Sequence, residues 1–148
     1  MKKQMTTLMA VAMFAMTLAV ASVHAQNAGS ISVTIPFEFA AAGKTLPAGD
    51  YYVRRSLDGA RVVMRIESKN CSLTVDLPTH GVQSADIQNE SKLVFNKYGE
   101  QFFLSQVWAA GRSTGEELNK TSRERGLQRE MAGRVGKPET INIAARLN

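Results

Sequence analysis

The chain has 148 residues, of which 44% are hydrophobic and 21% are charged, and its formal net charge is +5. A chain of this length has room for one domain with one modest core. Residues 26–111 hold eight basic and eight acidic side chains, so the excess of positive charge lies at the two ends of the chain. A nucleic-acid binder is expected to carry a clustered basic surface, and this distribution argues against one. We therefore expect no nucleic-acid partner.

The first 25 residues have the three-part layout of a secretory signal peptide. Two lysines near the start precede an apolar run over residues 8–23, and the segment ends at the small-residue motif Val23-His24-Ala25. A membrane anchor is the alternative, but a bilayer span needs about 20 apolar residues, and this run is shorter and is interrupted by two hydroxyl residues. The sequence therefore predicts cleavage after Ala25, a periplasmic or secreted location, no membrane span after cleavage, and a single β-rich domain over residues 26–148.

Residues 30–39 alternate between apolar and polar side chains, which predicts a half-buried strand. Pro36 has no amide hydrogen to donate, so we expect this strand to lie at a sheet edge or to carry a bulge there. The following "LPAG" predicts a type I turn with Pro47 at its second position.

Two hairpins are predicted next. A two-residue turn at Asp58-Gly59 sets Val53 opposite Met64, and a turn at Lys69-Asn70 sets Met64 opposite Val75. The apolar positions then continue on one face without a conflict of register. The predicted core face comprises Tyr51, Val53, Val62, Met64, Ile66, Cys71, Leu73, Val75 and Leu77. Residues 78–91 lose the alternation and predict a long connection, with a possible short strand over residues 82–87.

A third hairpin is predicted over residues 92–108, with its turn at Tyr98-Gly99 and Phe95 opposite Phe102. Its second strand is apolar on both faces. Phe102, Leu104 and Trp108 are expected on one face, and Phe103 and Val107 on the other. Something must cover the outer face of this strand.

A C-terminal helix is the predicted cover. Thr121 and Glu124 have the spacing of a capping box, Gly133 is a helix stop, and the helix is expected over about residues 122–132. We expect it to lay Leu127 and Met131 over Phe103 and Val107. A last strand, "ETINIAARL", alternates and could close the sheet.

These elements predict a mainly β fold, a small antiparallel sandwich or barrel with one C-terminal α-helix. An outer-membrane barrel is the alternative architecture. It would need an apolar band on its outer face, whereas the predicted outer positions carry charges at Arg54, Arg65 and Asp76. We therefore expect the soluble form.

The outer face of the first hairpin carries the candidate ligand-binding residues Tyr52, Arg54, Arg61 and Arg65. The predicted register places Tyr52 directly opposite Arg65, close enough for ring and guanidinium to stack. Arginine makes bidentate contacts to carboxylate or phosphate, and a tyrosine face packs on a sugar ring. The patch could thus hold an envelope component or an anionic polysaccharide. The alternative is an ordinary solvated sheet face on which Glu67 and Asp76 partly neutralise the arginines.

Catalytic motifs are scarce. After the leader the chain holds one histidine, His80, and one thiol, Cys71, so a small hydrolase using His80 with Cys71 or a nearby carboxylate is an alternative function. Zinc prefers three or four nitrogen or sulfur ligands, which one histidine cannot supply. "GRSTGEE", residues 111–117, lacks the lysine of a phosphate loop and predicts a linker. We therefore predict no catalytic residue, no metal and no cofactor.

Four segments, "VTIPFEF", "KTLPAGDYYV", "LVFNKYGEQFFLSQVW" and "TSRERGLQRE", resemble a family of small uncharacterised exported bacterial proteins. The likeness spans residues 31–130. It implies an extracytoplasmic β-rich domain with an LPAG turn and a C-terminal helix, and it carries over no catalytic residue and no ligand. Together with the leader, it favours an exported, non-enzymatic β-domain that acts as a binding or structural module of the cell envelope.

Overall fold

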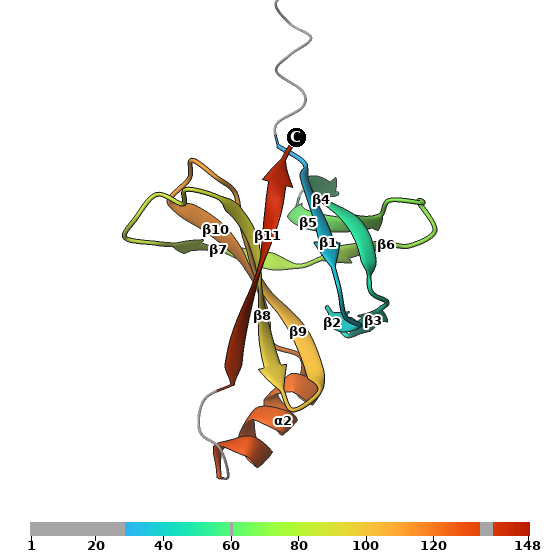
Figure 1. The fold of residues 1–148 in the computed structure, drawn as a ribbon, viewed down its shortest axis with the longest axis vertical. Coiled ribbons are helices and arrows are strands. Elements are labelled where there is room, and N and C mark those ends of the chain that lie inside the picture. The colour runs from blue at the N-terminus through green and yellow to red at the C-terminus, as the bar shows by residue number, and fades with distance from the viewer. Residues whose placement is uncertain (1–28, 60, 134–137) are drawn as a thin grey trace, which may run out of the picture.

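The computed structural model describes residues 29–59, 61–133 and 138–148. The predicted signal peptide lies outside these residues. The described residues form eleven strands and one helix (Figure 1). In chain order these are β1 (Ile31–Ile35), β2 (Phe39–Ala41), β3 (Lys44–Leu46), β4 (Gly49–Asp58), β5 (Arg61–Ser68), β6 (Thr74–Leu77), β7 (Thr79–Gln83), β8 (Ser91–Tyr98), β9 (Gln101–Trp108), β10 (Thr114–Leu118), α2 (Ser122–Ala132) and β11 (Glu139–Leu147).

All eleven strands belong to one sheet that curls into a half-barrel, so the predicted mainly β fold with a C-terminal helix is confirmed. The strand order is β3-β2-β9-β8-β11-β1-β4-β5-β6, and β10 pairs with both β9 and β7. The β2–β9 pair is parallel, so the sheet is mixed rather than purely antiparallel. Figure 1 shows β11 between a wing that contains β7 and β10 and a wing that contains β4, β5 and β6.

The chain passes directly between two edge strands of the curled sheet, β6 and β7. Pro78 alone separates β6, which pairs with β5, from β7, which pairs with β10. A proline has no amide hydrogen for a ladder, so it suits a point where a strand changes its partner. The predicted short strand over residues 82–87 overlaps β7 at Val82 and Gln83 alone, because β7 spans Thr79–Gln83 and residues 84–87 form no strand. The predicted linker "GRSTGEE" is wrong in its second half, because residues from Thr114 onward form β10 between β7 and β9.

The first strand lies inside the sheet rather than at an edge. β1 pairs with β4 on one side and with β11 on the other. Its last ladder pair joins Ile35 to Gly49, so Pro36 follows the ladder and removes no hydrogen bond from it. The predicted turn at Pro47 is a bend between β3 and β4, and the Tyr51 hydroxyl donates a hydrogen bond of 2.6 Å to the Pro47 carbonyl.

Two of the predicted hairpins turn one residue later than expected. Asp58 pairs with Arg61 and Tyr98 pairs with Gln101, so glycine occupies the first turn position in each. Gly59 and Gly99 have φ of 60° and 61°, and both kinds of two-residue hairpin turn, I′ and II′, need a positive φ at this position. The strand partners therefore move by two residues. Val53 opposes Ile66 and not Met64, and Phe95 opposes Leu104 and not Phe102.

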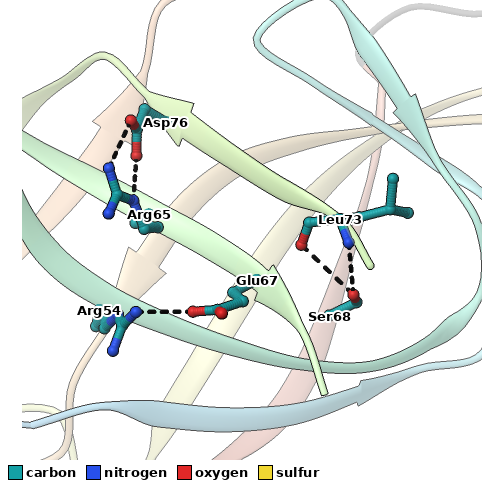
Figure 2. A network of polar contacts seen from close by, with 6 residues as sticks. All are labelled: Arg54, Arg65, Glu67, Ser68, Leu73 and Asp76. Atoms are coloured by element: carbon teal, nitrogen blue, oxygen red, sulfur yellow. Dashed lines mark hydrogen bonds and ion pairs between the residues drawn. The ribbon is translucent and has the colours of Figure 1, made fainter. Parts of the chain in front are cut away.

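The connection from β5 to β6 is a longer loop than the predicted two-residue turn, and Met64 consequently opposes Leu77 and not Val75. Ser68 organises the loop: its hydroxyl accepts a hydrogen bond of 2.9 Å from the Leu73 amide (Figure 2). Cys71 has a left-handed φ of 55° and is exposed, and Leu73 is 38% exposed. The prediction that Cys71 and Leu73 belong to the core is therefore wrong.

A β-bulge divides the third hairpin. Phe95 pairs with Leu104, but the preceding residue Val94 pairs with Gln106, which leaves Ser105 as the extra residue on β9. The bulge turns Val107 into the core, where it opposes Leu93. The expected faces of Val107 and Trp108 are thus exchanged.

The core lies on the concave side of the curled sheet and draws on nearly every strand. Its buried members are Ile31, Val33, Ile35, Phe39, Ala41, Leu46, Tyr51, Val53, Met64, Ile66, Val75, Leu77, Leu93, Phe95, Leu104, Val107 and Leu118. Side chains of β11 pack against this cluster from the middle of the sheet. The predicted role of the last strand is confirmed, because β11 joins β8 to β1.

Helix α2 has the predicted bounds and begins at the predicted cap. The Thr121 hydroxyl accepts a hydrogen bond of 3.2 Å from the Glu124 amide. The Glu124 side chain does not complete a capping box but reaches β8, where it accepts hydrogen bonds from Asn96 and Tyr98. The helix therefore lies on the outer face of the hairpin, on which Tyr98 meets Phe103 edge to face. It does not cover Val107, which lies on the concave face.

Candidate functional site

The predicted arginine patch is a ladder of ion pairs (Figure 2). Arg54 donates a hydrogen bond of 2.8 Å to Glu67, on the neighbouring strand. Arg65 makes a two-pronged contact to Asp76, with distances of 2.6 Å and 2.8 Å. The side chain of Arg61 lies outside the described part of the structure, although its backbone pairs with Asp58.

Tyr52 is not part of a stack with Arg65. The observed register places Tyr52 opposite Glu67 and places Arg54 opposite Arg65. The predicted stack is wrong for the same reason as the hairpin register: glycine takes the first turn position, so the partners move by two residues.

The ion pairs reduce the free positive charge of this surface. Because Arg65 donates hydrogen bonds to it, the pKa of the Asp76 carboxyl lies below its ordinary value, and the nearby positive charge acts in the same direction. The same hydrogen bonds raise the pKa of Arg65. With Arg54 held by Glu67 as well, the contacts favour a solvated sheet face for this part of the patch.

Tyr52 instead lines a polar cleft of about 390 Å³ on the outer face of the sheet. The cleft lies over the three adjacent strands β11, β1 and β4. Its lining residues are Ser32, Val33, Thr34, Asp50, Tyr51, Tyr52, Lys69, Ala144, Ala145 and Arg146. We call it the Tyr52 cleft.

Cross-strand pairing explains why these side chains meet. Ser32 on β1 pairs with Tyr52 on one side and with Arg146 on the other, so these three side chains form one row on the same face. The next row begins with Thr34 and Asp50, and the Lys69 amide donates a hydrogen bond of 2.9 Å to the Asp50 carbonyl. Lys69 therefore extends the second row from the end of β5.

The Tyr52 cleft brings the positive charges of Lys69 and Arg146 together with the Tyr52 ring and with side-chain oxygen atoms. The Thr34 hydroxyl donates a hydrogen bond of 2.6 Å to Asp50. Within the described residues, neither Lys69 nor Arg146 has a carboxylate within ion-pair distance. The cleft thus offers two cations, the carboxylate of Asp50, one aromatic face and several hydrogen-bonding groups to a ligand. Its net charge is positive, which suits a hydroxyl-rich anion.

His80 and Cys71 are not brought together. The His80 Nε2 atom lies 3.4 Å from a carboxylate oxygen of Glu117, its partner across the β7–β10 ladder, and the imidazole is half exposed. Cys71 lies in the loop that joins β5 to β6, and Asp76 is bound by Arg65. Among the residues that the structure describes, no hydrogen bond or ion pair connects His80 with Cys71 or Asp76. This geometry gives no Cys71–His80 pair of nucleophile and base, whereas it does place His80 beside one carboxylate, that of Glu117.

In residues 29–59, 61–133 and 138–148, no group of three or more His, Cys, Asp or Glu side chains gathers as metal ligands would. Over the same residues, α2 is too short and too polar to cross a bilayer.

Sequence reasoning found Tyr52 but missed its neighbours. Alternation in β1 could have placed Ser32 and Thr34 on the outer face, since the apolar residues of that strand point inward. Nothing local could have placed Arg146 beside them, because that contact depends on the pairing of the first strand with the last. Comparison of the chain with protein-family models, with curated proteins and with solved structures found no match.

Proposed function

We propose that this chain is an exported, non-enzymatic binding module of the cell envelope, and that its Tyr52 cleft holds an anionic polysaccharide. The observation that carries the proposal is the meeting of Tyr52, Lys69 and Arg146 in one cleft on the exposed face of the sheet. The leader-like first 25 residues support export to the periplasm or beyond. The resemblance to small exported bacterial proteins supports the same location and remains a prediction.

The chemistry of the cleft matches a sugar acid better than a simple anion. A pyranose ring presents C–H groups that pack on an aromatic face, and its hydroxyls exchange hydrogen bonds with groups such as Ser32 and Asp50. The carboxylate of the sugar acid would be met by Lys69 and Arg146, whose charges are not used by a neighbouring carboxylate within the described residues. An open cleft on a strand surface can accept a polymer that continues beyond both of its ends.

Affinity electrophoresis in native gels tests this proposal. We expect migration to be retarded by alginate, a polymer of sugar acids, and much less by dextran, a neutral glucose polymer. Tyr52→Ser should weaken the retardation because it removes the packing face. Lys69→Gln combined with Arg146→Gln should abolish the preference for alginate, because it removes both cations.

Arg54→Gln is the matched control, since Arg54 lies on the same face but is bound to Glu67. It should retain the retardation of the wild type. Circular dichroism spectra of all variants should coincide, because the substituted side chains lie outside the core. Equal retardation of the wild type and the Lys69, Arg146 double variant would remove the Tyr52 cleft from consideration, and equal retardation by alginate and dextran would remove the anionic ligand.

A further inference from the structure

A second cleft, of about 410 Å³, lies at one end of the half-barrel. It is found where β1 begins and β11 ends, and Figure 1 shows these two ends side by side between the two wings of the sheet. Its lining residues are Gly29, Ile31, Arg55, Met64, Val107, Ala109, Arg112, Thr114, Gly115, Glu116 and Leu147. None of them lines the Tyr52 cleft. We call it the mouth cleft.

The floor of the mouth cleft is apolar. Ile31, Met64 and Val107 belong to the buried core and present their surfaces to the cleft from β1, β5 and β9. Leu147 lies at the rim and is 48% exposed, which is unusual for a large aliphatic side chain next to a core. A ligand with an apolar body would bury this surface.

A charged residue occupies an inward position at this end of β4. Tyr51, Val53 and Arg55 alternate on the concave side, and Arg55 opposes Met64 on β5. The first two are core residues, whereas Arg55 forms an ion pair with Glu116 of β10. An inward-facing position of β4 therefore carries a guanidinium group at the entrance of the mouth cleft.

Glu116 holds that guanidinium in place. One of its carboxylate oxygens contacts Arg55, and the other accepts a hydrogen bond of 2.9 Å from the Thr79 hydroxyl. The Glu116 side chain is 13% exposed, so it is anchored well inside the rim. Arg55 has five N–H groups and uses one of them here, so the others remain available to a ligand.

Arg112 adds a second guanidinium to the same entrance. It lines the mouth cleft and is exposed, and within the described residues no carboxylate lies at ion-pair distance from it. The entrance thus holds two positive groups and one negative group above an apolar floor. A net positive charge beside buried apolar side chains is complementary to a molecule with an anionic head and an apolar tail.

We propose that the mouth cleft binds an amphiphilic carboxylate, of the class of medium-chain fatty acids. Its carboxylate would accept hydrogen bonds from Arg112 and from the free N–H groups of Arg55. Its chain would lie on Ile31, Met64 and Val107, with Leu147 covering it from the rim. This site is independent of the Tyr52 cleft, and either proposal can fail without the other.

Isothermal titration calorimetry with three probes of equal chain length tests the proposal: decanoate and decyltrimethylammonium below their critical micelle concentrations, and decanol below its solubility limit. Decanoate should bind most tightly, because only its head group is complementary to the two arginines. Arg112→Gln should weaken decanoate binding about tenfold, the size expected for a lost charge-assisted hydrogen bond, and should leave decanol binding unchanged. Arg112 is exposed and lies outside the core, so the variant should fold.

Tyr52→Ser is the control that separates this site from the proposed polysaccharide site, and it should bind decanoate as the wild type does. Three results would overturn the proposal. They are the absence of decanoate binding, equal affinity of the wild type for all three probes, and equal affinity of the wild type and Arg112→Gln for decanoate.

Discussion

The carboxylate of Glu124, on α2, accepts a hydrogen bond of 3.4 Å from the hydroxyl of Tyr98, on β8, and both residues are buried. The same carboxylate oxygen accepts a hydrogen bond of 3.0 Å from Asn96. A buried carboxylate is costly unless hydrogen bonds replace its hydration. The helix is therefore fastened to the sheet by a buried polar contact, and Glu124 is its one buried residue.

Because of this contact, the free energy of unfolding is expected to fall as the pH rises through the alkaline range. Burial, together with the charge and hydrogen bond of Glu124, raises the pKa of Tyr98 from 10.0 to about 12. The folded state thus holds the phenol proton more tightly than the unfolded state does. The resulting stability is fully present below pH 10 and is lost as the pH rises toward 12. We expect a loss of roughly 2–3 kcal/mol from this group across that interval, measured by urea unfolding.

Tyr98→Phe should remove this part of the pH dependence, because phenylalanine has no proton to lose. The difference in unfolding free energy between wild type and Tyr98→Phe should therefore shrink as the pH rises above 10. Tyr52→Phe is the control, since Tyr52 lies on the outer face of the sheet and makes no contact with Glu124. A wild type and a Tyr98→Phe variant with parallel stability curves would contradict the prediction.

The two central glycines of the β7–β10 ladder are expected to respond differently to alanine. A Cβ atom at Gly115 would lie 2.6 Å from the Trp108 indole, whereas a Cβ at Gly81 meets nothing within 4 Å. Trp108 is 7% exposed and faces Gly115 across the neighbouring β9–β10 ladder, so it has little freedom to withdraw. We expect Gly115→Ala to cost about 1–3 kcal/mol, as overpacking does.

Gly81→Ala supplies the matched control, because Gly81 lies in the strand that pairs with β10. It should be neutral or slightly stabilising, since alanine loses less backbone entropy than glycine. Urea unfolding followed by fluorescence measures both, and Trp108 is the sole tryptophan of the chain. The emission maximum should shift in Gly115→Ala alone. Equal unfolding midpoints for the two variants would show that the indole moves without cost.

The ion pair between Arg65 and Asp76 predicts that the pKa of Asp76 depends on Arg65. Hydrogen bonds from Arg65 are the largest cause of the lowered pKa of Asp76. Arg65→Gln removes the charge, so the pKa of Asp76 should rise toward its ordinary value. An NMR titration of the side-chain carboxyl carbon of Asp76 measures this shift directly.

Arg54→Gln is the comparison for that titration. Arg54 is bound to Glu67 and makes no contact with Asp76, so its replacement should leave the midpoint of Asp76 nearly unchanged. If both substitutions moved the midpoint of Asp76 equally, the effect would come from the general charge of the sheet face and not from the hydrogen-bonded pair.

The alternation of side chains was sufficient to predict much of the core. Met64 and Val75 point inward as expected, although each pairs with a different residue from the one predicted. A turn that begins one residue later moves the partner by two residues, and two is the period of a strand. The error in register therefore left the inward and outward faces unchanged. The helix bounds were predictable for a similar local reason, since Thr121 and Gly133 are signals within the segment itself.

Other placements depended on contacts that no local pattern contains. The bulge at Ser105 exchanged the faces of Val107 and Trp108, and the Ser68 loop carried Cys71 out to solvent. The two-residue alternation of a strand predicts the face on which a side chain lies only while the ladder of backbone hydrogen bonds is regular. An extra residue or a side chain that bonds the backbone ends that regularity.

The sequence by itself determined a β-rich chain, its inward-facing strand positions and its C-terminal helix, because these follow from the periods of strand and helix. Only the tertiary structure decided the two clefts. Arg146 meets Ser32 and Tyr52 because the last strand pairs with the first, and Arg55 meets Glu116 because the sheet curls. Contacts between residues far apart in the chain arise from the closure of the whole sheet, and local side-chain preferences do not encode them.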